Sequence, residues 1–240
     1  MSKKIVIGSL AALVAVAIGI TAWFATRDSG PEQLVLGERA TTTTQPSDGE
    51  GDEPTTTVAS EEPAPDGVEG EWTVNNESLA GYRVVEDFAG GISDFEAVGR
   101  TSDVTGSLTI AGTQVTDANF SVDVATIVSD DGRRDNQFAG PIMNSDEFPT
   151  ADFVLTSPIE LGSIPDDGTD VTADATGDLT LRGVTNTVTF PLTARLVGSQ
   201  IETLGAIDVV FADYNIDNPS FAAISVRDVG LVEFSLIFDR

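Results

Sequence analysis

Apolar and polar residues alternate along most of the chain after residue 70. The alternation is clearest over Gly177–Pro191, in two runs whose apolar members are Leu179, Leu181, Val188 and Phe190. A period of two is typical of a strand that buries one face. Because residues 182–186 (Arg-Gly-Val-Thr-Asn) separate the two runs, we predict a β-hairpin with its turn there.

The same alternation continues on both sides of this hairpin. It covers residues 104–110, 120–125, 153–155, 171–181, 188–196 and 232–238. Turn-forming pairs, such as Ala111-Gly112 and Asn218-Pro219, lie between the runs. Residues 136–148 leave room for a short helix or a long loop. About eight strands, each with one apolar face, predict an all-β domain over residues 71–240, either an up-and-down barrel or a sandwich.

The N-terminus follows a different pattern. Lys3 and Lys4 precede a largely apolar run from Ile5 to Ala25, which as a helix would be roughly 31 Å long and would match a bilayer core. We predict a single-pass transmembrane signal anchor over residues 1–26. Both lysines precede the run, so the positive-inside rule places the N-terminus in the cytoplasm and the rest of this cell-membrane protein outside it. A signal peptide that is cleaved is the competing interpretation.

Residues 27–70 are rich in Thr, Pro and acidic residues. Such a segment cannot bury enough apolar surface to offset the entropy lost on ordering, and its negative charges repel one another. We predict a disordered acidic linker that holds a folded domain, residues 71–240, away from the membrane. The short apolar run Leu34–Leu36 is interpreted as a chance triplet or a juxtamembrane contact and not as a folded element.

The charge of the chain excludes one class of partner. Twelve Lys and Arg residues against 39 Asp and Glu residues give a net charge of −27, so a nucleic acid would be repelled from almost any face. The acidity also disfavours docking by charge on an anionic leaflet, and we attribute it to solubility. The chain has no Cys, which excludes disulfides and a lipid anchor on Cys.

Candidate catalytic and metal-binding residues are few. The chain has no His, and residues 71–240 contain no Lys, so the usual bases of acyl-transfer nucleophiles are missing. Residues 213–217 begin like an EF-hand loop but continue without its Gly and Glu. Acidic residues cluster on a predicted loop, where solvated carboxylates are more common than a glycosidase pair. They are Asp130, Asp131, Asp135, Asp146 and Glu147. We therefore predict a protein that is not an enzyme and has no metal site.

The interior of a barrel of about eight strands is filled by side chains or holds one slender ligand. Twelve Phe residues would give its wall a rigid apolar surface. Small residues at positions predicted to face inward would leave space: Ala173, Ala175, Gly177, Ala194 and Gly205. Patterning alone is equally compatible with a solid core in which large and small side chains interdigitate.

Several sequence blocks together resemble the YceI-like family, the polyisoprenoid-binding proteins of bacterial envelopes. Residues 177–185 (Gly-Asp-Leu-Thr-Leu-Arg-Gly-Val-Thr) are similar to one family signature, and Arg134-Asp135 followed by Glu147–Ser157 is similar to another. The resemblance covers residues 71–240. It implies an extended, antiparallel, lipocalin-like eight-stranded β-barrel whose apolar cavity holds the tail of a quinone or a polyprenyl lipid.

Two positions depart from the family pattern. The family usually has a His near the position of Tyr82, whereas this chain has no His, and it often has an Arg where Phe211 stands. Both departures concern the polar end of the ligand and leave the barrel unaffected. Arg133-Arg134 is a candidate for contact with an acidic head group; alternatively, Arg134 and Asp135 hold their own loop by charge-assisted hydrogen bonds.

These residues and the resemblance lead to one main hypothesis: a membrane-tethered, extracytoplasmic protein that holds a polyisoprenoid or other long-chain lipid for transport, storage or sensing. The lipid and the membrane are the predicted partners, and no cofactor is predicted apart from a bound isoprenoid lipid. The candidate cavity residues are Phe120, Val122, Phe138, Met143, Phe153, Leu155, Leu179, Phe190 and Phe234. The alternative is a solid-core β-domain for adhesion or scaffolding at the cell surface, without a ligand. The identity of the lipid and the oligomeric state, a dimer included, stay open.

Overall fold

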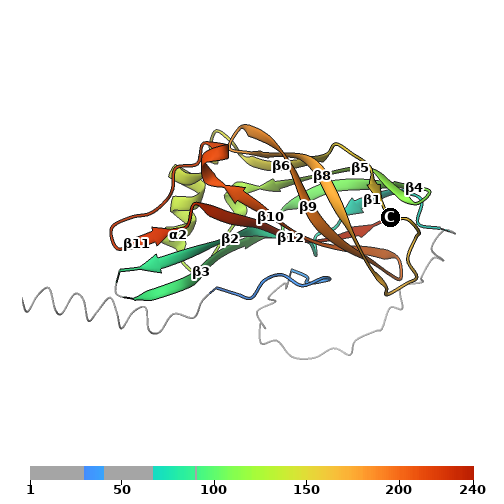
Figure 1. Cartoon of the computed structure of the whole chain (residues 1–240), viewed down its shortest axis with the longest axis horizontal. Helices are drawn as coiled ribbons and strands as arrows, with labels where there is room; N and C mark the ends of the chain where they lie inside the picture. The colour runs from blue at the N-terminus through green and yellow to red at the C-terminus, as the bar shows by residue number, and fades with distance from the viewer. Residues whose placement is uncertain (1–29, 41–66, 90) are drawn as a thin grey trace, which may run out of the picture.

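The computed structural model describes residues 30–40, 67–89 and 91–240 (Figure 1). The predicted anchor over residues 1–26 and most of the predicted linker lie outside these residues. Within the described ranges, no helix is both long and apolar enough to cross a membrane.

Twelve strand segments form one antiparallel sheet in the described part of the chain. They are β1 (Gly70–Val74), β2 (Leu79–Phe88), β3 (Ile92–Thr101), β4 (Val104–Ala111), β5 (Gln114–Asp123), β6 (Thr150–Leu155), β7 (Ile159–Glu160), β8 (Asp170–Leu181), β9 (Val184–Val197), β10 (Gln200–Val210), β11 (Ile224–Val226) and β12 (Val229–Asp239). The order β1-β4-β5-β6-β8-β9-β10-β12 closes on itself because β12 also pairs with β1.

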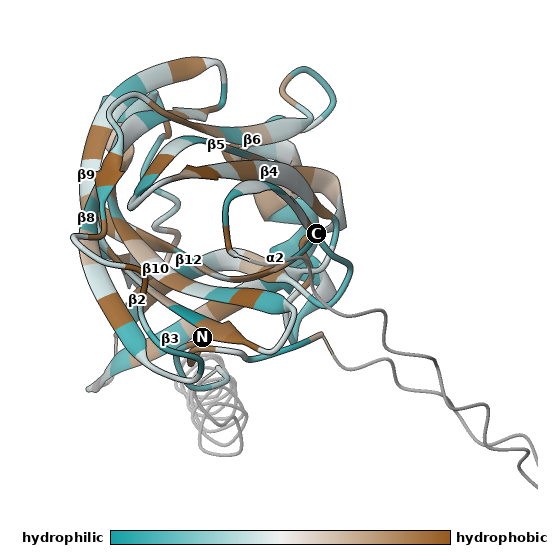
Figure 2. Cartoon of the chain, turned by 90° about the vertical axis from the view of Figure 1, so that its right-hand side faces the viewer, coloured by the Kyte–Doolittle hydropathy of each residue, from teal (hydrophilic) through white to brown (hydrophobic). Residues whose placement is uncertain are grey.

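The sheet is a closed eight-stranded barrel, which confirms the predicted all-β fold class and the barrel over the sandwich. β2 continues β1, and β3 leads into β4, so that each of these two pairs acts as one long strand. β2 pairs with β12 on one side and with β3 on the other. Figure 2, turned by 90°, looks into one end of the barrel and shows the strands as a ring.

The hairpin of β8 and β9 is the one predicted from the alternating pattern, but its turn is shorter than predicted. Leu181 pairs with Val184, which leaves Arg182 and Gly183 as a two-residue turn with φ of 49° and 74°. Two-residue turns with positive φ match the twist of the flanking strands, so residues 184–186 belong to β9 instead of the turn. Three pairs of threonine hydroxyls, 2.7, 2.9 and 3.0 Å apart, cross-link the two strands.

Short helical segments connect some of the strands. The helix α2 (Gly132–Gln137) and the π-helical turn η2 (Phe138–Ile142) lie between β5 and β6, and α2 begins before the segment predicted to hold a helix or loop. Asp131 caps α2, because its carboxylate accepts a hydrogen bond from the backbone nitrogen of Arg133 at 2.9 Å. Two 3-10 turns, η1 (Val124–Thr126) and η3 (Phe211–Tyr214), follow β5 and β10.

Residues 30–40 lie on the outside of the barrel, and we call them the N-terminal strap (blue in Figure 1). Leu34 is 6% exposed, so the apolar run interpreted as a chance triplet contains a buried residue. The backbone nitrogens of Gly30 and Ala40 donate to the carbonyl oxygens of Glu96 and Glu77, each at 2.9 Å. Both ends of the strap are therefore hydrogen-bonded to the barrel domain.

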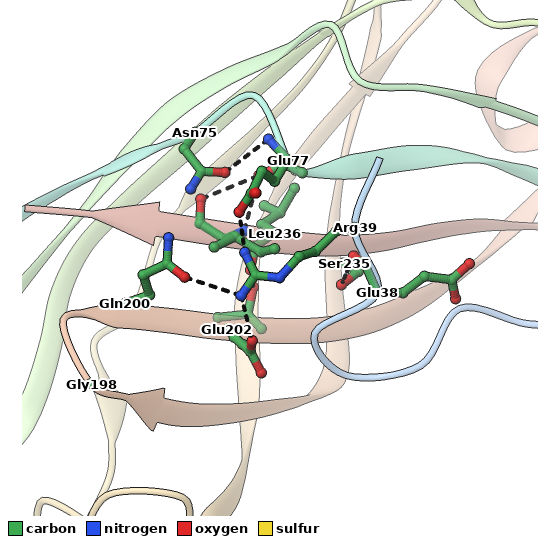
Figure 3. Close-up of polar contacts among 12 residues, drawn as sticks. Glu38, Arg39, Asn75, Glu77, Gly198, Gln200, Glu202, Ser235 and Leu236 are labelled. Carbon is green, nitrogen blue, oxygen red and sulfur yellow. Dashed lines mark hydrogen bonds and ion pairs between the residues drawn. The ribbon is translucent and has the colours of Figure 1, made fainter. Parts of the chain in front are cut away.

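Arg39 attaches the C-terminal half of the strap (Figure 3). Its guanidinium donates to Glu202 Oε1 at 2.9 Å and to Gln200 Oε1 at 3.0 Å, and it also pairs with Glu77. Such charge-assisted hydrogen bonds, together with the burial of Leu34, offset the entropy lost when the strap is ordered. For residues 30–40 the structure therefore differs from the predicted disordered linker.

Candidate functional site

Two partly open cavities lie in the described part of the barrel. Cavity 1 has a volume of about 100 Å³ and lies among β5, β6, β8, β9, β10 and β12. Cavity 2 has a volume of about 210 Å³ and lies at the end of the barrel that carries α2, η2 and β11. The lining of cavity 1 is apolar except for Arg195 and Thr203. Polar side chains border cavity 2 at four positions, which are Tyr82, Glu86, Arg134 and Gln137. The interior is thus an apolar container with polar groups gathered in one compartment.

Four phenylalanines from β5, β6, β9 and β12 meet inside the barrel, and we call them the Phe layer. The ring centroid of Phe120 lies 5.1 Å from that of Phe153 and 5.2 Å from that of Phe234. The centroid of Phe190 lies 5.5 Å from that of Phe153 and 5.9 Å from that of Phe234. Each ring therefore contacts two others in a closed circuit, at separations where aromatic pairs attract one another.

Two glycines make room for the Phe layer. A Cβ atom on Gly205 would lie well under 3.0 Å from a ring carbon of Phe234, and one on Gly177 would be equally close to the ring of Phe153. The prediction that these two small inward residues leave space is wrong, because aromatic rings fill it. The three alanines of the same prediction, Ala173, Ala175 and Ala194, do border cavity 1.

Tyr82 and Arg134 define the polar part of cavity 2. The ring of Tyr82 stacks on that of Phe138, with centroids 4.4 Å apart and an angle of 23° between the planes. Burial raises the pKa of the Tyr82 hydroxyl far above its usual value, so this group is neutral at physiological pH. Arg134 lies on α2, pairs with Asp130, and places its Nη2 3.9 Å from Glu86 Oε2.

The neighbouring Asp135 holds the loop before α2. Its Oδ1 accepts hydrogen bonds from the backbone nitrogen of Ser129 at 2.8 Å and from the Ser129 hydroxyl at 2.6 Å. Together with the ion pair between Arg134 and Asp130, these hydrogen bonds hold the loop before α2, as the second alternative of the sequence analysis expected. Arg134 also borders cavity 2, and its contact with a head group stays a prediction.

Eight of the nine predicted cavity residues border one of the two cavities. Cavity 1 is bordered by Phe120, Phe153, Leu155, Phe190 and Phe234. Cavity 2 is bordered by Val122, Phe138 and Met143. Leu179 borders neither cavity and is 2% exposed. All nine side chains thus belong to the apolar interior or its lining, and whether each touches a ligand stays a prediction.

Sequence reasoning missed Glu86 and Gln137 as neighbours of a cavity. Glu86 is polar, and alternation assigns polar residues to the outer face of a strand, whereas Gln137 lies in the segment left open as a helix or loop, so no signal marked either residue. Phe211, noted as a departure from the family pattern, borders cavity 2 with an apolar ring. Tyr82, near the position of the family's His, thus keeps a polar group in cavity 2, whereas Phe211 replaces the family's Arg with an apolar ring.

The acidic residues considered for metal binding act in turns. Asp213 accepts a hydrogen bond from Asn186 Nδ2 through its backbone carbonyl at 2.8 Å, and Asn215 reverses the chain with a φ of 53°. Among the residues that the structure describes, no group of three or more Asp, Glu, His or Cys side chains is placed to hold a metal ion. Residues 213–217 therefore form a polar turn after β10.

Comparison with known proteins identifies the family. A sequence profile of the YceI-like domain matches residues 72–238. The chain belongs to the YceI-like family. This confirms the resemblance found in the sequence. Because the match begins within β1 and ends within β12, it covers the whole barrel of this YceI-like protein.

Two solved structures share the fold of this YceI-like protein. A polyisoprenoid-binding domain from Saccharophagus degradans, implicated in plant cell wall breakdown, has a TM-score of 0.57 and 17% identity, over 71% of this chain and 98% of its own. BcnA from Burkholderia cenocepacia has a TM-score of 0.53 and 20% identity, over 68% of this chain and 98% of its own. Identities this low establish the common fold alone. A search of curated proteins returned no match.

Proposed function

We propose that this YceI-like protein binds a long-chain polyisoprenoid or a related lipid, of the quinone or polyprenyl type, inside its barrel. The observation that carries the proposal is the interior, which holds two cavities with largely apolar walls. Moving apolar surface from water into such a container contributes about 25 cal/mol per Å². The relative from Saccharophagus degradans, a polyisoprenoid-binding domain, has the same fold and supports this choice of ligand.

The polar groups of cavity 2 suit the head group of such a lipid. Arg134 and Gln137 supply N–H donors, and the neutral Tyr82 hydroxyl both donates and accepts. A head group with carbonyl, hydroxyl or phosphate oxygens would find donors here, while its tail would lie against the apolar wall. We assign the head group to cavity 2 on this basis.

Binding without chemical change is the proposed activity. The chain has no His and no Cys, and residues 71–240 have no Lys, so the usual activated nucleophiles are missing. We further propose that residues 1–26 anchor the protein in the cell membrane with the barrel outside the cytoplasm. There it would carry, store or sense the lipid.

Mass spectrometry of an organic extract tests the proposal. The full-length protein, purified from the membranes of expressing cells, is expected to release an isoprenoid lipid. Ala151 on β6 borders cavity 2, whereas Val154 on the same strand is 51% exposed. Ala151→Phe is expected to release much less lipid than the wild type, and Val154→Phe, which adds the same ring outside the barrel, as much as the wild type.

The same experiment separates this proposal from its alternative. Recovery of no lipid from the wild-type protein would favour a solid-core domain for adhesion or scaffolding, an interpretation that the packed Phe layer also supports. Equal recovery from both variants would show that any lipid found is carried on the outer surface, and the proposal would fail.

A further inference from the structure

The interior of the barrel is divided into two compartments by the Phe layer. All four of its side chains border cavity 1 and none of them borders cavity 2. On three of the strands, the residue two positions away borders cavity 2 instead: Val122 follows Phe120, Ala151 precedes Phe153 and Val232 precedes Phe234. Residues two apart point to the same face of a strand, so the Phe layer lies between the two cavities along the barrel.

Apolar side chains on other strands complete the division. Leu179 on β8 and Ile207 on β10 are each 2% exposed and border neither cavity. Gly177 and Gly205, on the same two strands, allow the rings of Phe153 and Phe234 to lie close to the wall. The layer is thus closely packed from one side of the barrel to the other.

The size of each compartment limits what it can hold. At about 100 and 210 Å³, both cavities are smaller than the roughly 300 Å³ at which pockets for small ligands begin. A short apolar chain fits in cavity 2 alone, whereas a long chain needs both cavities. To reach cavity 1 from cavity 2, a chain must separate at least one of the ring contacts in the Phe layer.

We propose that the Phe layer determines chain-length selectivity by acting as a gate within the barrel. This inference rests on the proposed function and assigns these four residues a role in it. A lipid with a short tail keeps its head group and its whole tail in cavity 2 and leaves the rings in place. A lipid with a long tail binds only as the rings move apart, and its affinity is lowered by the loss of their mutual contacts.

Binding of two isoprenoid alcohols tests the gate. The delipidated full-length protein is titrated with geraniol, whose two isoprene units fit cavity 2, and with geranylgeraniol, whose four isoprene units do not, and bound fractions are measured by native mass spectrometry. Phe234→Leu removes two of the ring contacts, so the affinity for geranylgeraniol relative to geraniol is expected to rise roughly tenfold. Phe120→Leu also removes two contacts, and because Phe120 is only partly buried it provides a second variant should Phe234→Leu fold poorly.

The matched control is Phe95→Leu. Phe95 pairs with Phe88 at a centroid distance of 5.6 Å and borders neither cavity, so this variant loses an aromatic contact away from the Phe layer. Its ratio of affinities should equal that of the wild type. A ratio that is unchanged in both Phe-layer variants, or that rises equally in the control, would overturn the gate and leave the proposed function intact. Binding of neither alcohol by any form of the protein would overturn both.

Discussion

Arg83 and Glu233 form an ion pair on the outer side of the barrel, with Arg83 Nε 3.1 Å from Glu233 Oε2 and side chains that are 2% and 4% exposed. Arg100 Nη2 lies 2.8 Å from Glu233 Oε1, so one carboxylate serves two guanidinium groups. The N-terminal strap covers the cluster, because the carbonyl of Pro31 accepts a hydrogen bond from Arg83 Nη2 at 2.8 Å. The barrel therefore has a buried charged cluster outside its apolar interior.

Glu233→Gln tests how far this cluster stabilises the fold. The change removes the negative charge shared by Arg83 and Arg100, which keep only their more exposed partners Glu96 and Glu38. Breaking a buried ion pair costs about 3–5 kcal/mol of the free energy of unfolding when the remaining charge has no partner, so we expect a loss at or below the lower end of this range. Chemical denaturation measures the loss. The control is Asp170→Asn, which breaks the exposed ion pair with Arg195 and should change stability little. Equal losses in the two variants would contradict the assignment of a buried cluster.

Arg39→Ala should release the N-terminal strap without unfolding the barrel. The variant loses the hydrogen bonds to Glu202 and Gln200 and the pairing with Glu77. Exchange of the backbone N–H of Ala40, which donates to Glu77, is expected to accelerate about five- to tenfold, as for the loss of about 1 kcal/mol of local stability. Hydrogen exchange followed by mass spectrometry of the strap peptide measures the rate.

The control for the strap is Arg227→Ala. Arg227 pairs with Asp94, which lies on the β2–β3 hairpin. Loss of the Arg227 side chain should leave hydrogen exchange of the backbone amides in residues 30–40 unchanged. Any faster exchange should be confined to amides of the β2–β3 hairpin. A strap that exchanges at the same rate in wild type and in Arg39→Ala would show that Leu34 and the backbone contacts hold it alone.

Strands β4, β5, β6, β8, β9 and β12 could be predicted from the sequence because each carries an alternating run, whereas β2, β3 and β10 lie outside the predicted runs. In β8 the apolar and polar residues alternate throughout, and in β9 they alternate except at Asn186, Pro191 and Val197. The register then follows from the pairing of Leu181 with Val184. Alternation alone could not distinguish a barrel from a sandwich. The sequence blocks that resemble the YceI-like family favoured the closed barrel. Within the predicted hairpin the strand pattern failed at the turn, because Asn186 is a residue that is also common in turns.

The strap and the Phe layer could not be predicted in the same way. The strap is ordered by partners such as Glu202 and Gln200, more than 150 residues away in the chain, and its own composition resembles that of a linker. The four phenylalanines were identified as inward-facing, but which rings meet depends on the stagger of strands that are not adjacent. Phe190 and Phe234, for example, meet across β10.

Tyr82 should make the stability of the protein depend on pH in the alkaline range. Burial raises the pKa of its hydroxyl in the folded state above the unfolded value of about 10. The contribution of the Tyr82 hydroxyl to the free energy of unfolding is fully present below about pH 10. It is lost as the pH rises further, because the unfolded chain then releases a proton that the folded protein retains. Urea denaturation between about pH 8 and about pH 11 should show this decline, and it should be shallower in Tyr82→Phe.

The variant Tyr82→Phe keeps the ring that stacks on Phe138, so its stability near neutral pH is a control for packing. Burial also raises the pKa of Tyr214, and part of the alkaline decline should therefore persist in the variant. A decline of the same slope in both proteins would show that the Tyr82 hydroxyl ionises as readily in the folded state as in the unfolded chain.

Gly205→Ala tests whether the Phe layer fills the barrel as tightly as its geometry indicates. The added methyl group would lie well under 3.0 Å from the ring of Phe234, so we expect a loss of about 1–3 kcal/mol in the free energy of unfolding. Gly140→Ala is the control, since a methyl group there meets no atom within 4 Å. Its stability should stay close to that of the wild type.

A double variant separates steric conflict from any intrinsic effect of alanine in β10. If the methyl group of Gly205→Ala strains the protein only by displacing the ring of Phe234, then the substitution should cost less when Phe234→Leu is already present. The double variant should lose at least about 0.5 kcal/mol less of the free energy of unfolding than the sum of the two single losses. Chemical denaturation of the wild type, the two single variants and the double variant measures this difference. Additive losses would mean that the ring moves aside freely, and the Phe layer would then be too loosely packed to restrict the passage of a lipid tail.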